Sequence, residues 1–235
     1  MSTPAPSFPD DDDARHQTVD ADDWDEIYLV GDVHGCLDAL EKLLAELDPS
    51  DDDLVVFVGD LVRKGPDSQG VVERVREADN MISVRGNNED KLIRGDKELP
   101  ELTDEDMAYI HEMPVALSFD DALVVHGGID PRKPLDDHTP NEVLNMRSLA
   151  PDGSYDRPYW FEEHADGPRV FFGHTVLESP VERRHAVGLD TGCVYGGELT
   201  AYSYWEDEFV AVSLDGDGKG RKDSKIVTPP AKRVA

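Results

Sequence analysis

Five short apolar runs in this chain each end in a glycine-containing segment that carries acidic, amide or imidazole side chains. The segments are Gly31–Gly35, Gly59–Asp60, Gly86–Glu89, His126–Gly128 and Gly173–Thr175. Short runs rich in valine, isoleucine and leucine are typical of buried strands. Loops that follow neighbouring strands bring their side chains together at one edge of a sheet. The pattern therefore restricts the chain to a sheet-containing fold with a polar site beyond the ends of its strands.

The residues between the first runs have the spacing of amphipathic helices. After the run 27–30, the positions Leu37, Leu40, Leu44 and Leu47 lie on one helical face. Repeats of strand, loop and helix predict parallel strands joined by helical crossovers. Farther along, the sequence predicts helices at 103–113 and 139–149, a hairpin at 115–125 and an antiparallel pair at 199–214. We expect an α/β fold, a sandwich of mixed sheets with helices outside.

The two ends of the chain differ in composition from its middle. Residues 1–23 contain the run Asp10–Asp13 and several prolines but little apolar surface, which predicts a disordered acidic tail. From residue 215 the sequence is rich in glycine and then in basic residues, which predicts a second flexible tail over 215–235. The length of 235 residues supports one sizeable core, and we expect it to occupy residues 24–214.

The chain is strongly acidic. It carries 52 acidic and 23 basic residues, for a net charge of −29. This charge argues against general affinity for nucleic-acid polymers or anionic membranes, which are themselves polyanions. A surface of this kind is typical of a protein kept soluble at high salt, where screening removes most self-repulsion. The N-terminal residues lack a signal-peptide pattern, and no apolar run approaches the roughly 18 residues of a membrane span, so we expect a cytoplasmic protein.

The polar segments offer only oxygen and imidazole nitrogen as metal ligands. The candidates are Asp32, His34, Asp60, Asn87, His126 and His174. Taken singly, an aspartate after a strand is more often a cap or turn residue, and a lone histidine is more often a hydrogen-bonded core residue. Jointly, ligands of this type in loops spread over half the chain indicate a dinuclear metal site. The set predicts a metal-dependent hydrolase.

These motifs, in this order, resemble the calcineurin-like metallophosphoesterases, in particular the phosphoprotein phosphatase superfamily with its diadenosine tetraphosphatase and ApaH-like branches. The resemblance covers about residues 27–214 and includes Leu189–Gly197. It implies that one divalent ion is held by Asp32, His34 and Asp60, and the other by Asp60, Asn87, His126 and His174. A bridging hydroxide would then attack phosphorus in line. Because no thiolate is present, Mn²⁺ fits this set well, with Zn²⁺, Fe and Ni²⁺ as alternatives.

The resemblance also suggests which side chains bind the anionic, phosphate-containing substrate. Lys64 stands where the family motif has a phosphate-binding arginine, and it supplies a point charge in place of a planar fork. Arg147 is a second phosphate candidate by a weaker resemblance. An arginine that caps the end of the preceding helix is the alternative for Arg147.

The chain departs from the family at the group that protonates the leaving oxygen. The second motif normally reads Gly-Asp-x-x-Asp-Arg-Gly, but here Arg63 replaces its second aspartate; the third normally has a histidine where this chain has Asn88. An amide cannot serve as an acid. We therefore count Asp60, Lys64, Arg63 and Asn88 as the catalytic candidates, with a solvent-exposed loop residue as the alternative for Arg63.

Loss of this acid favours substrates whose leaving group is already stable as an anion, since general-acid help is worth about 10²–10⁴-fold and most for basic leaving groups. We expect cleavage of phosphoanhydrides in dinucleoside polyphosphates, nucleotides or polyphosphate. One alternative is a phosphomonoesterase such as a serine/threonine protein phosphatase. The other is a metal-dependent sensor that binds phosphate compounds without turnover.

Overall fold

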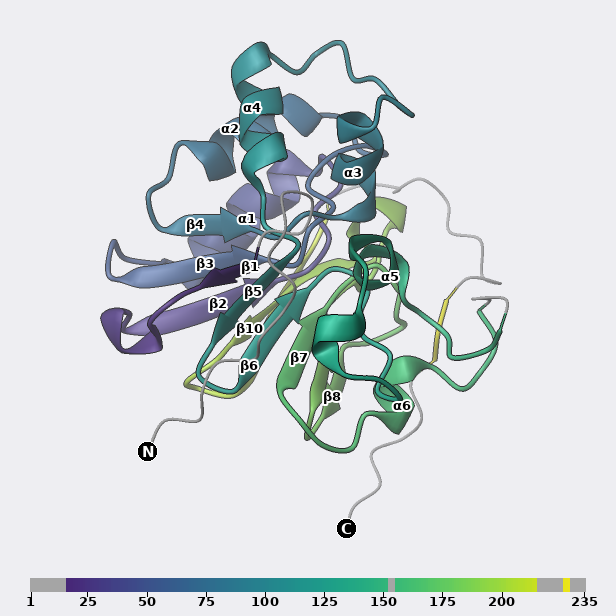
Figure 1. The fold of residues 1–235 in the computed structure, drawn as a ribbon. Coiled ribbons are helices and arrows are strands. Elements are labelled where there is room, and N and C mark those ends of the chain that lie inside the picture. Colours follow the sequence, from purple (N-terminus) through teal and green to yellow (C-terminus); the bar gives the residue numbers. More distant parts are fainter. Residues whose placement is uncertain (1–15, 152–154, 215–225, 229–235) are drawn as a thin grey trace.

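The computed structural model describes residues 16–151, 155–214 and 226–228. Its strands form two sheets that pack face to face, with helices on the outer sides (Figure 1). The strands are β1 His16–Thr18, β2 Glu26–Val30, β3 Asp53–Phe57, β4 Met81–Ser83, β5 Ala116–Phe119, β6 Ala122–Val125, β7 Arg169–Phe172, β8 Val181–Arg183, β9 Ala186–Gly188, β10 Glu198–Ser203 and β11 Glu208–Ser213. The helices are α1 Leu37–Leu47, α2 Ser68–Arg76, α3 Asn87–Ile93, α4 Asp104–Glu112, α5 Pro140–Asn145 and α6 Trp160–Glu163, with 3₁₀ turns η1 Ala21–Asp23, η2 Leu135–Asp137 and η3 Cys193–Tyr195.

The first sheet has the order β11-β10-β2-β3-β4. Strands β2, β3 and β4 are parallel, and α1 and α2 make the crossovers that the helical spacing predicted. Strands β10 and β11 close the other edge as an antiparallel pair, again as predicted. Because β2 and β3 are parallel neighbours, the loops that follow them leave the sheet at the same edge.

The second sheet has the order β1-β5-β6-β7-β9-β8. The predicted hairpin is present as β5 and β6, which pair antiparallel. Strands β6, β7 and β9 run parallel to one another, so the loops after β6 and β7 also leave the sheet together. The fold is the expected α/β sandwich of mixed sheets.

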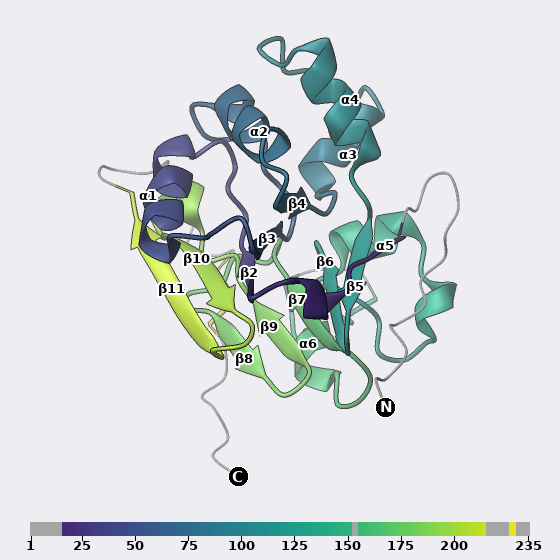
Figure 2. The ribbon, with the colours of Figure 1, turned by 90° about the vertical axis from the view of Figure 1, so that its left-hand side faces the viewer.

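Alternating side chains on the central strands separate the core into layers. In β2, Ile27 and Leu29 pack between the two sheets with Phe119 and Phe171 of the second sheet. Val30 points the other way and packs with the apolar faces of α1 and α2. On the far side, α5 and α6 cover the second sheet. The result is a helix–sheet–sheet–helix arrangement, which Figure 2 shows with α1 and α2 on one side and α5 on the other.

Several predicted boundaries differ from those of the structure. Residues 16–23, assigned by composition to the disordered tail, form β1 and η1, because β1 pairs in parallel with the edge strand β5. Val227, in the predicted C-terminal tail, is buried and bridges to Leu177. Apart from residues 16–23 and 226–228, both predicted tails lie outside the described residues. Helix α5 is shorter than predicted, although Thr139 caps it and Pro140 opens it as expected.

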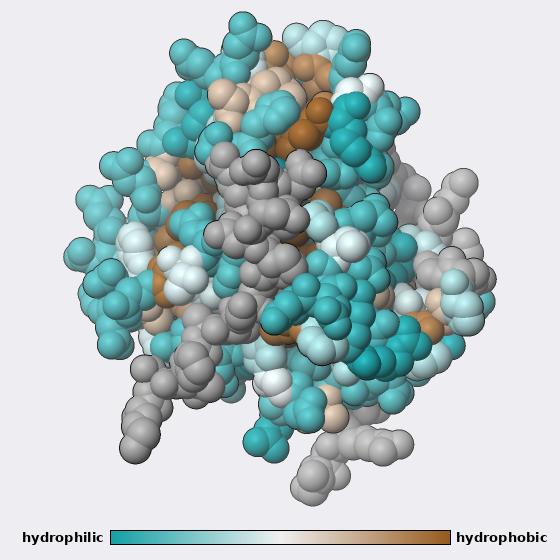
Figure 3. Space-filling model, in the orientation of Figure 1, coloured by the Kyte–Doolittle hydropathy of each residue, from teal (hydrophilic) through white to brown (hydrophobic). Residues whose placement is uncertain are grey.

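The outer surface agrees with the composition. The face shown in Figure 3 is mostly hydrophilic. Within the ranges that the structure describes, Trp205 is the one large apolar side chain classed as exposed, and no helix has the length and apolar character needed to cross a bilayer.

Candidate metal centre

The loops after four strands and one helix N-terminus meet at one end of the sandwich. Asp32 follows β2 and Asp60 follows β3, while Asn87 is the first residue of α3 after β4. His126 and His174 follow β6 and β7 of the other sheet. The site thus lies across the junction of the two sheets, beyond the carboxyl ends of their parallel strands.

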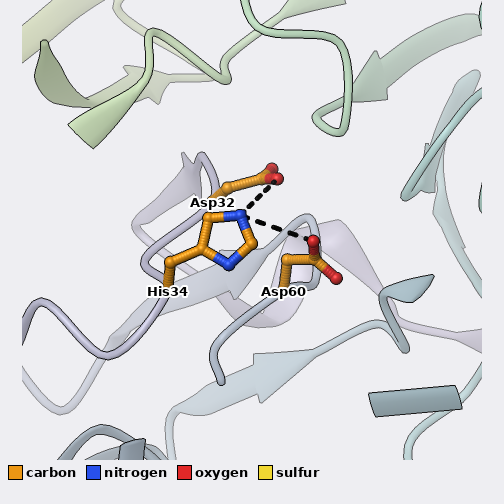
Figure 4. Close-up of side chains that lie close together, drawn as sticks. All are labelled: Asp32, His34 and Asp60. Carbon is orange, nitrogen blue, oxygen red and sulfur yellow. Dashed lines mark ion pairs between the residues drawn. The ribbon is translucent and has the colours of Figure 1, made fainter. Parts of the chain in front are cut away.

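Asp32, His34 and Asp60 form a compact buried cluster. Each offers one ligand atom, and these atoms lie within 4.8 Å of one another. Nε2 of His34 is 3.7 Å from Asp32 and 3.5 Å from Asp60, and Figure 4 shows this ring nitrogen facing both carboxylates. All three residues are almost completely shielded from solvent. The sequence predicted these residues as the ligands of one ion, and the structure brings them together.

His126 and His174 complete the cluster from the second sheet. Nε2 of His126 lies 3.4 Å from the Oδ1 atom of Asp60. The rings of His126 and His174 are 5.0 Å apart between centroids. The backbone N–H of His174 donates to Asp32 over 3.1 Å, which ties the loop after β7 to the loop after β2. Residues more than a hundred positions apart are therefore held in direct contact.

The hydrogen bonds of the histidines determine which ring nitrogen is available. Nδ1 of His34 donates to the carbonyl of Val62 over 3.1 Å, and Nδ1 of His126 donates to that of Val58 over 2.9 Å. Each ring is thus held in the tautomer that carries a lone pair on Nε2, facing Asp60. Burial lowers the pKa of His34 to about 4 and also lowers the pKa of His126. Both imidazoles are consequently neutral near pH 7, the form that binds a metal.

The two carboxylates have opposite environments. Burial, reinforced by the nearby Asp190, raises the pKa of Asp32 well above its usual value. Burial also acts to raise the pKa of Asp60, but His126, His34, Lys64 and the backbone N–H of Asn88 together outweigh it and hold this pKa below its usual range. A buried carboxylate pair of this kind is costly without a cation between its members.

The donor set fits a divalent cation. Nε2 of His126 is buried and has no hydrogen-bond partner among the described residues, so its lone pair is free for a ligand bond. Gly173 and Gly86 pack directly against the two carboxylates. A Cβ atom at Gly173 would lie 2.0 Å from an oxygen of Asp32, and one at Gly86 would lie 2.3 Å from an oxygen of Asp60, so neither position has room for a side chain. Oxygen and imidazole ligands suit Mn²⁺, Zn²⁺, Fe or Ni²⁺.

Asn87 and Asn88 occupy different places in the site. Asn87 is partly exposed; its amide donates to Asn145 over 3.4 Å and its carbonyl oxygen accepts from Asn88 over 3.0 Å. Asn88 is buried and donates a hydrogen bond to each oxygen of Asp60. Its backbone N–H donates to Oδ1 over 2.9 Å, and its side-chain amide donates to Oδ2. Nη1 of Arg63 donates to the Asn88 carbonyl oxygen over 2.5 Å. Asn88 therefore orients the central carboxylate, a role that its sequence position did not reveal.

Glu89 is a buried residue that the sequence reasoning did not single out. Its carboxylate accepts hydrogen bonds from the backbone N–H groups of Gly86, Asp60 and Val62, at 2.8, 3.0 and 3.1 Å. Burial, with the charge of Asp60, raises the pKa of Glu89 to about 7. Its spacing from Gly86 is that of a helix capping box, which was the available signal. Glu89 joins the loop after β3 to the N-terminus of α3.

The two predicted phosphate-binding cations lie directly on the cluster. Nζ of Lys64 is 2.6 Å from Nε2 of His34, and Nη2 of Arg147 is 2.5 Å from Nε2 of His174. Burial acts to lower the pKa of Lys64, but Asp60, Tyr195 and Asp32 together raise it by more, so Lys64 stays charged. Tyrosine rings lie beside both cations, with Tyr195 near Lys64 and Tyr155 near Arg147.

Backbone strain is concentrated in the same loops. His34, Asp60 and His174 have φ values of 51°, 55° and 62°, and Arg63 and Lys64 have values of 70° and 69°. Residues with a side chain rarely adopt this left-handed conformation, and when they do they commonly cluster at functional sites. The fold holds these side chains in the site at a cost in local conformational energy.

The chain belongs to the calcineurin-like phosphoesterase family, whose sequence profile matches residues 26–213. A bis(5'-nucleosyl)-tetraphosphatase of Halalkalibacterium halodurans is 31% identical over 78% of this chain and 92% of its own length. Serine/threonine-protein phosphatase 1 of Salmonella typhimurium is 28% identical over 79% of this chain and 94% of its own. Among solved structures, one described as a candidate diadenosine tetraphosphatase has a TM-score of 0.77 and 30% identity, covering 86% of this chain and all of the other. The protein is therefore a hydrolase of phosphoester or phosphoanhydride bonds that uses divalent metal ions.

Proposed function

We propose that this protein is a phosphohydrolase with two divalent ions, most readily Mn²⁺, that cleaves phosphoanhydride bonds in dinucleoside polyphosphates, nucleotides or polyphosphate. The observation that carries the dinuclear proposal is the position of Asp60. Its Oδ2 lies 3.5 Å from Nε2 of His34 and its Oδ1 lies 3.4 Å from Nε2 of His126, so each carboxylate oxygen faces a different imidazole. A carboxylate so placed suits two ions that share it as a ligand.

The remaining ligands divide between the two sides. Asp32 and His34 would hold one ion with Asp60, and the other would be held with Asp60 by Asn87, His126 and His174. Two bound ions supply an activated water as nucleophile at neutral pH and positive charge for the phosphoryl oxygens. No side chain of the cluster is then needed as a covalent nucleophile.

Lys64 and Arg147 would bind the phosphoryl oxygens. Both are charged and partly buried, and both already contact imidazoles of the cluster. Nε of Arg147 is buried without a hydrogen-bond partner among the described residues, which leaves a donor for a phosphate oxygen. Charge-assisted bonds of this type stabilise the charge that develops during transfer.

The preference for anhydrides follows from Asn88 and Arg63. Neither side chain donates a proton readily near pH 7, because the amide is not an acid and the guanidinium does not deprotonate. A phosphate or nucleotide leaves as a stable anion without this help, whereas an alkoxide does not. The tetraphosphatase relatives support the same substrate class.

A second candidate function is that of a serine/threonine protein phosphatase, which the relative from Salmonella typhimurium favours. The lack of an acid at positions 63 and 88 opposes it. A sensor that binds phosphate compounds without turnover is the third alternative. The presence of all six candidate ligands, five of them buried and Asn87 partly exposed, opposes that one. Mn²⁺ as the physiological metal, the high-salt surface, the absence of nucleic-acid and membrane partners and a cytoplasmic location stay predictions.

A substrate panel tests the proposal. The purified protein is loaded with Mn²⁺ and supplied with diadenosine tetraphosphate, tripolyphosphate, para-nitrophenyl phosphate and a phosphoserine peptide, and phosphate or nucleotide release is measured. We expect kcat/KM on the two anhydrides to exceed that on the phosphopeptide by at least about 100-fold, the lower bound of general-acid assistance. A preference for the phosphopeptide would favour the protein phosphatase, and no turnover of any substrate would favour the sensor.

A further inference from the structure

Two cations beside the metal centre are free of ion pairs in a protein with a large excess of acidic residues. Arg63 and Lys91 form no ion pair with a carboxylate in the described part of the chain. Elsewhere, six arginines form ion pairs with carboxylates: Arg74, Arg76, Arg94, Arg132, Arg157 and Arg169. Arg63 and Lys91 thus lie near the candidate metal centre without a paired carboxylate, in a protein with 52 acidic and 23 basic residues.

Arg63 is held close to the centre of the site. Its guanidinium donates to the carbonyl oxygen of Asn88, whose amide in turn donates to Asp60. One amide group therefore separates the Arg63 guanidinium from the central carboxylate. The contact with Asn88 uses Nη1, so the planar fork has further N–H donors for another acceptor.

Lys91 approaches from the same helix as Asn88. It lies three residues after Asn88 and four after Asn87 in α3, so the three side chains share one face of that helix. Lys91 is partly exposed and reachable from solvent. Burial lowers the pKa of its ammonium, the charge of Asp60 acts to raise this pKa, and the charges of Arg63 and Lys64 act to lower it. Lys91 therefore lies within electrostatic range of Arg63 and Lys64 as well as of Asp60.

We propose that Arg63 and Lys91 form a subsite for a second phosphate of the substrate, next to the phosphate bound at the metal centre. This inference rests on the proposed function and refines its substrate class to compounds with at least two linked phosphates. A phosphate linked to one bound at the metal ions that Asp60 would hold would lie near Arg63, and its negative charge would relieve the repulsion between the two cations. Arg63 then replaces leaving-group protonation by binding the leaving phosphate as an anion.

Equilibrium binding of non-hydrolysable probes tests the subsite apart from turnover. The dissociation constants of orthophosphate and of imidodiphosphate are measured by calorimetry at fixed free Mn²⁺ for the wild type, Arg63→Gln and Lys91→Gln. The control is Arg94→Gln, which removes the same charge from the end of α3 but from a residue paired with Asp90 and Asp96. Bound Mn²⁺ and the unfolding midpoint are determined for every variant.

We expect Arg63→Gln to weaken imidodiphosphate relative to orthophosphate by about tenfold, and Lys91→Gln by about threefold, as the loss of a charge-assisted contact and of a more exposed one predicts. Arg94→Gln should leave this ratio unchanged. An unchanged ratio in both Arg63→Gln and Lys91→Gln would overturn the subsite, as would a loss of bound Mn²⁺ that accounts for the whole effect. The ratio decides the subsite even if the wild type hydrolyses no anhydride, a result that would instead refute the proposed function.

Discussion

Replacement of Asp60 by asparagine is the sharpest test of the dinuclear arrangement, because it keeps the shape of the side chain and removes its charge. Each oxygen of Asp60 faces one imidazole, at 3.5 Å for His34 and 3.4 Å for His126, and each accepts one N–H of Asn88. In Asp60→Asn, the new NH₂ group must point toward a donor of Asn88 in either orientation. The variant thus loses a shared anionic ligand and gains one unfavourable donor–donor contact.

The size of both effects follows from these contacts. If each oxygen–ion contact is worth no less than a charge-assisted hydrogen bond, about 1.5–3 kcal/mol, the two together amount to about 3–6 kcal/mol. That corresponds to a loss of about 10²–10⁴-fold in metal affinity. The donor–donor contact costs about 1–3 kcal/mol of folding free energy, but removal of a buried charge offsets part of it. The metal-free variant should therefore stay folded, with a midpoint lowered by less than about 10 °C.

The assay measures metal content after equilibration at defined free Mn²⁺, together with the thermal midpoint and kcat/KM on tripolyphosphate. Asp90→Asn is a matched control, since Asp90 lies in α3 but pairs with Arg94 outside the cluster. We expect the control to retain metal and activity, and Asp60→Asn to lose most of both. Two ions bound per chain at wild-type affinity in Asp60→Asn would refute the shared-ligand argument.

Three further predictions follow from the site and the surface. Because the side chains of residues 63 and 88 touch, the double variant Arg63→Asp with Asn88→His should raise kcat/KM on an alkyl phosphate by about tenfold or more. Neither single variant should do so, and an equal gain on a nucleotide anhydride would contradict the leaving-group argument. Burial lowers the pKa of His34 from 6.5 to about 4, so the unfolded state binds more protons between these values. Because the raised pKa values of Glu89 and Asp32 act with the opposite sign over the same pH range, the His34 contribution is read as a difference between the metal-free wild type and His34→Gln. The wild type should lose about 3 kcal/mol more than the variant in denaturant titrations between pH 6.5 and pH 4; equal pH dependence of the two would contradict a neutral buried imidazole. Finally, the net charge of −29 predicts an unfolding midpoint that rises with KCl into the molar range, and a flat or falling midpoint would remove the high-salt interpretation.

The sequence alone was sufficient for the fold class and for the candidate residues that the structure brings together at one end of the sandwich. Each of the residues Asp32, Asp60, His126 and His174 follows a short apolar run, and such runs can be recognised as buried strands from the sequence alone. A polar residue directly after a run then marks the end of the strand. Parallel connections then place these ends at one edge. Composition was a poorer guide at the termini, where β1 is ordered only because β5 offers a free edge.

The local chain could not show how side chains from different loops meet. The contact of Arg63 with Asn88, the hydrogen bonds of Asn88 to Asp60, and those of Glu89 to the loop after β3 each join residues about 25 or more positions apart. Sequence reasoning read positions 63 and 88 as a missing acid, whereas the structure shows a hydrogen-bonded connection between a cation and the central carboxylate. Residue types and their order determined which ligands the chain offers. Packing of the two sheets decided which atoms those ligands face, because the distances and the burial that set their pKa values exist only in the folded protein.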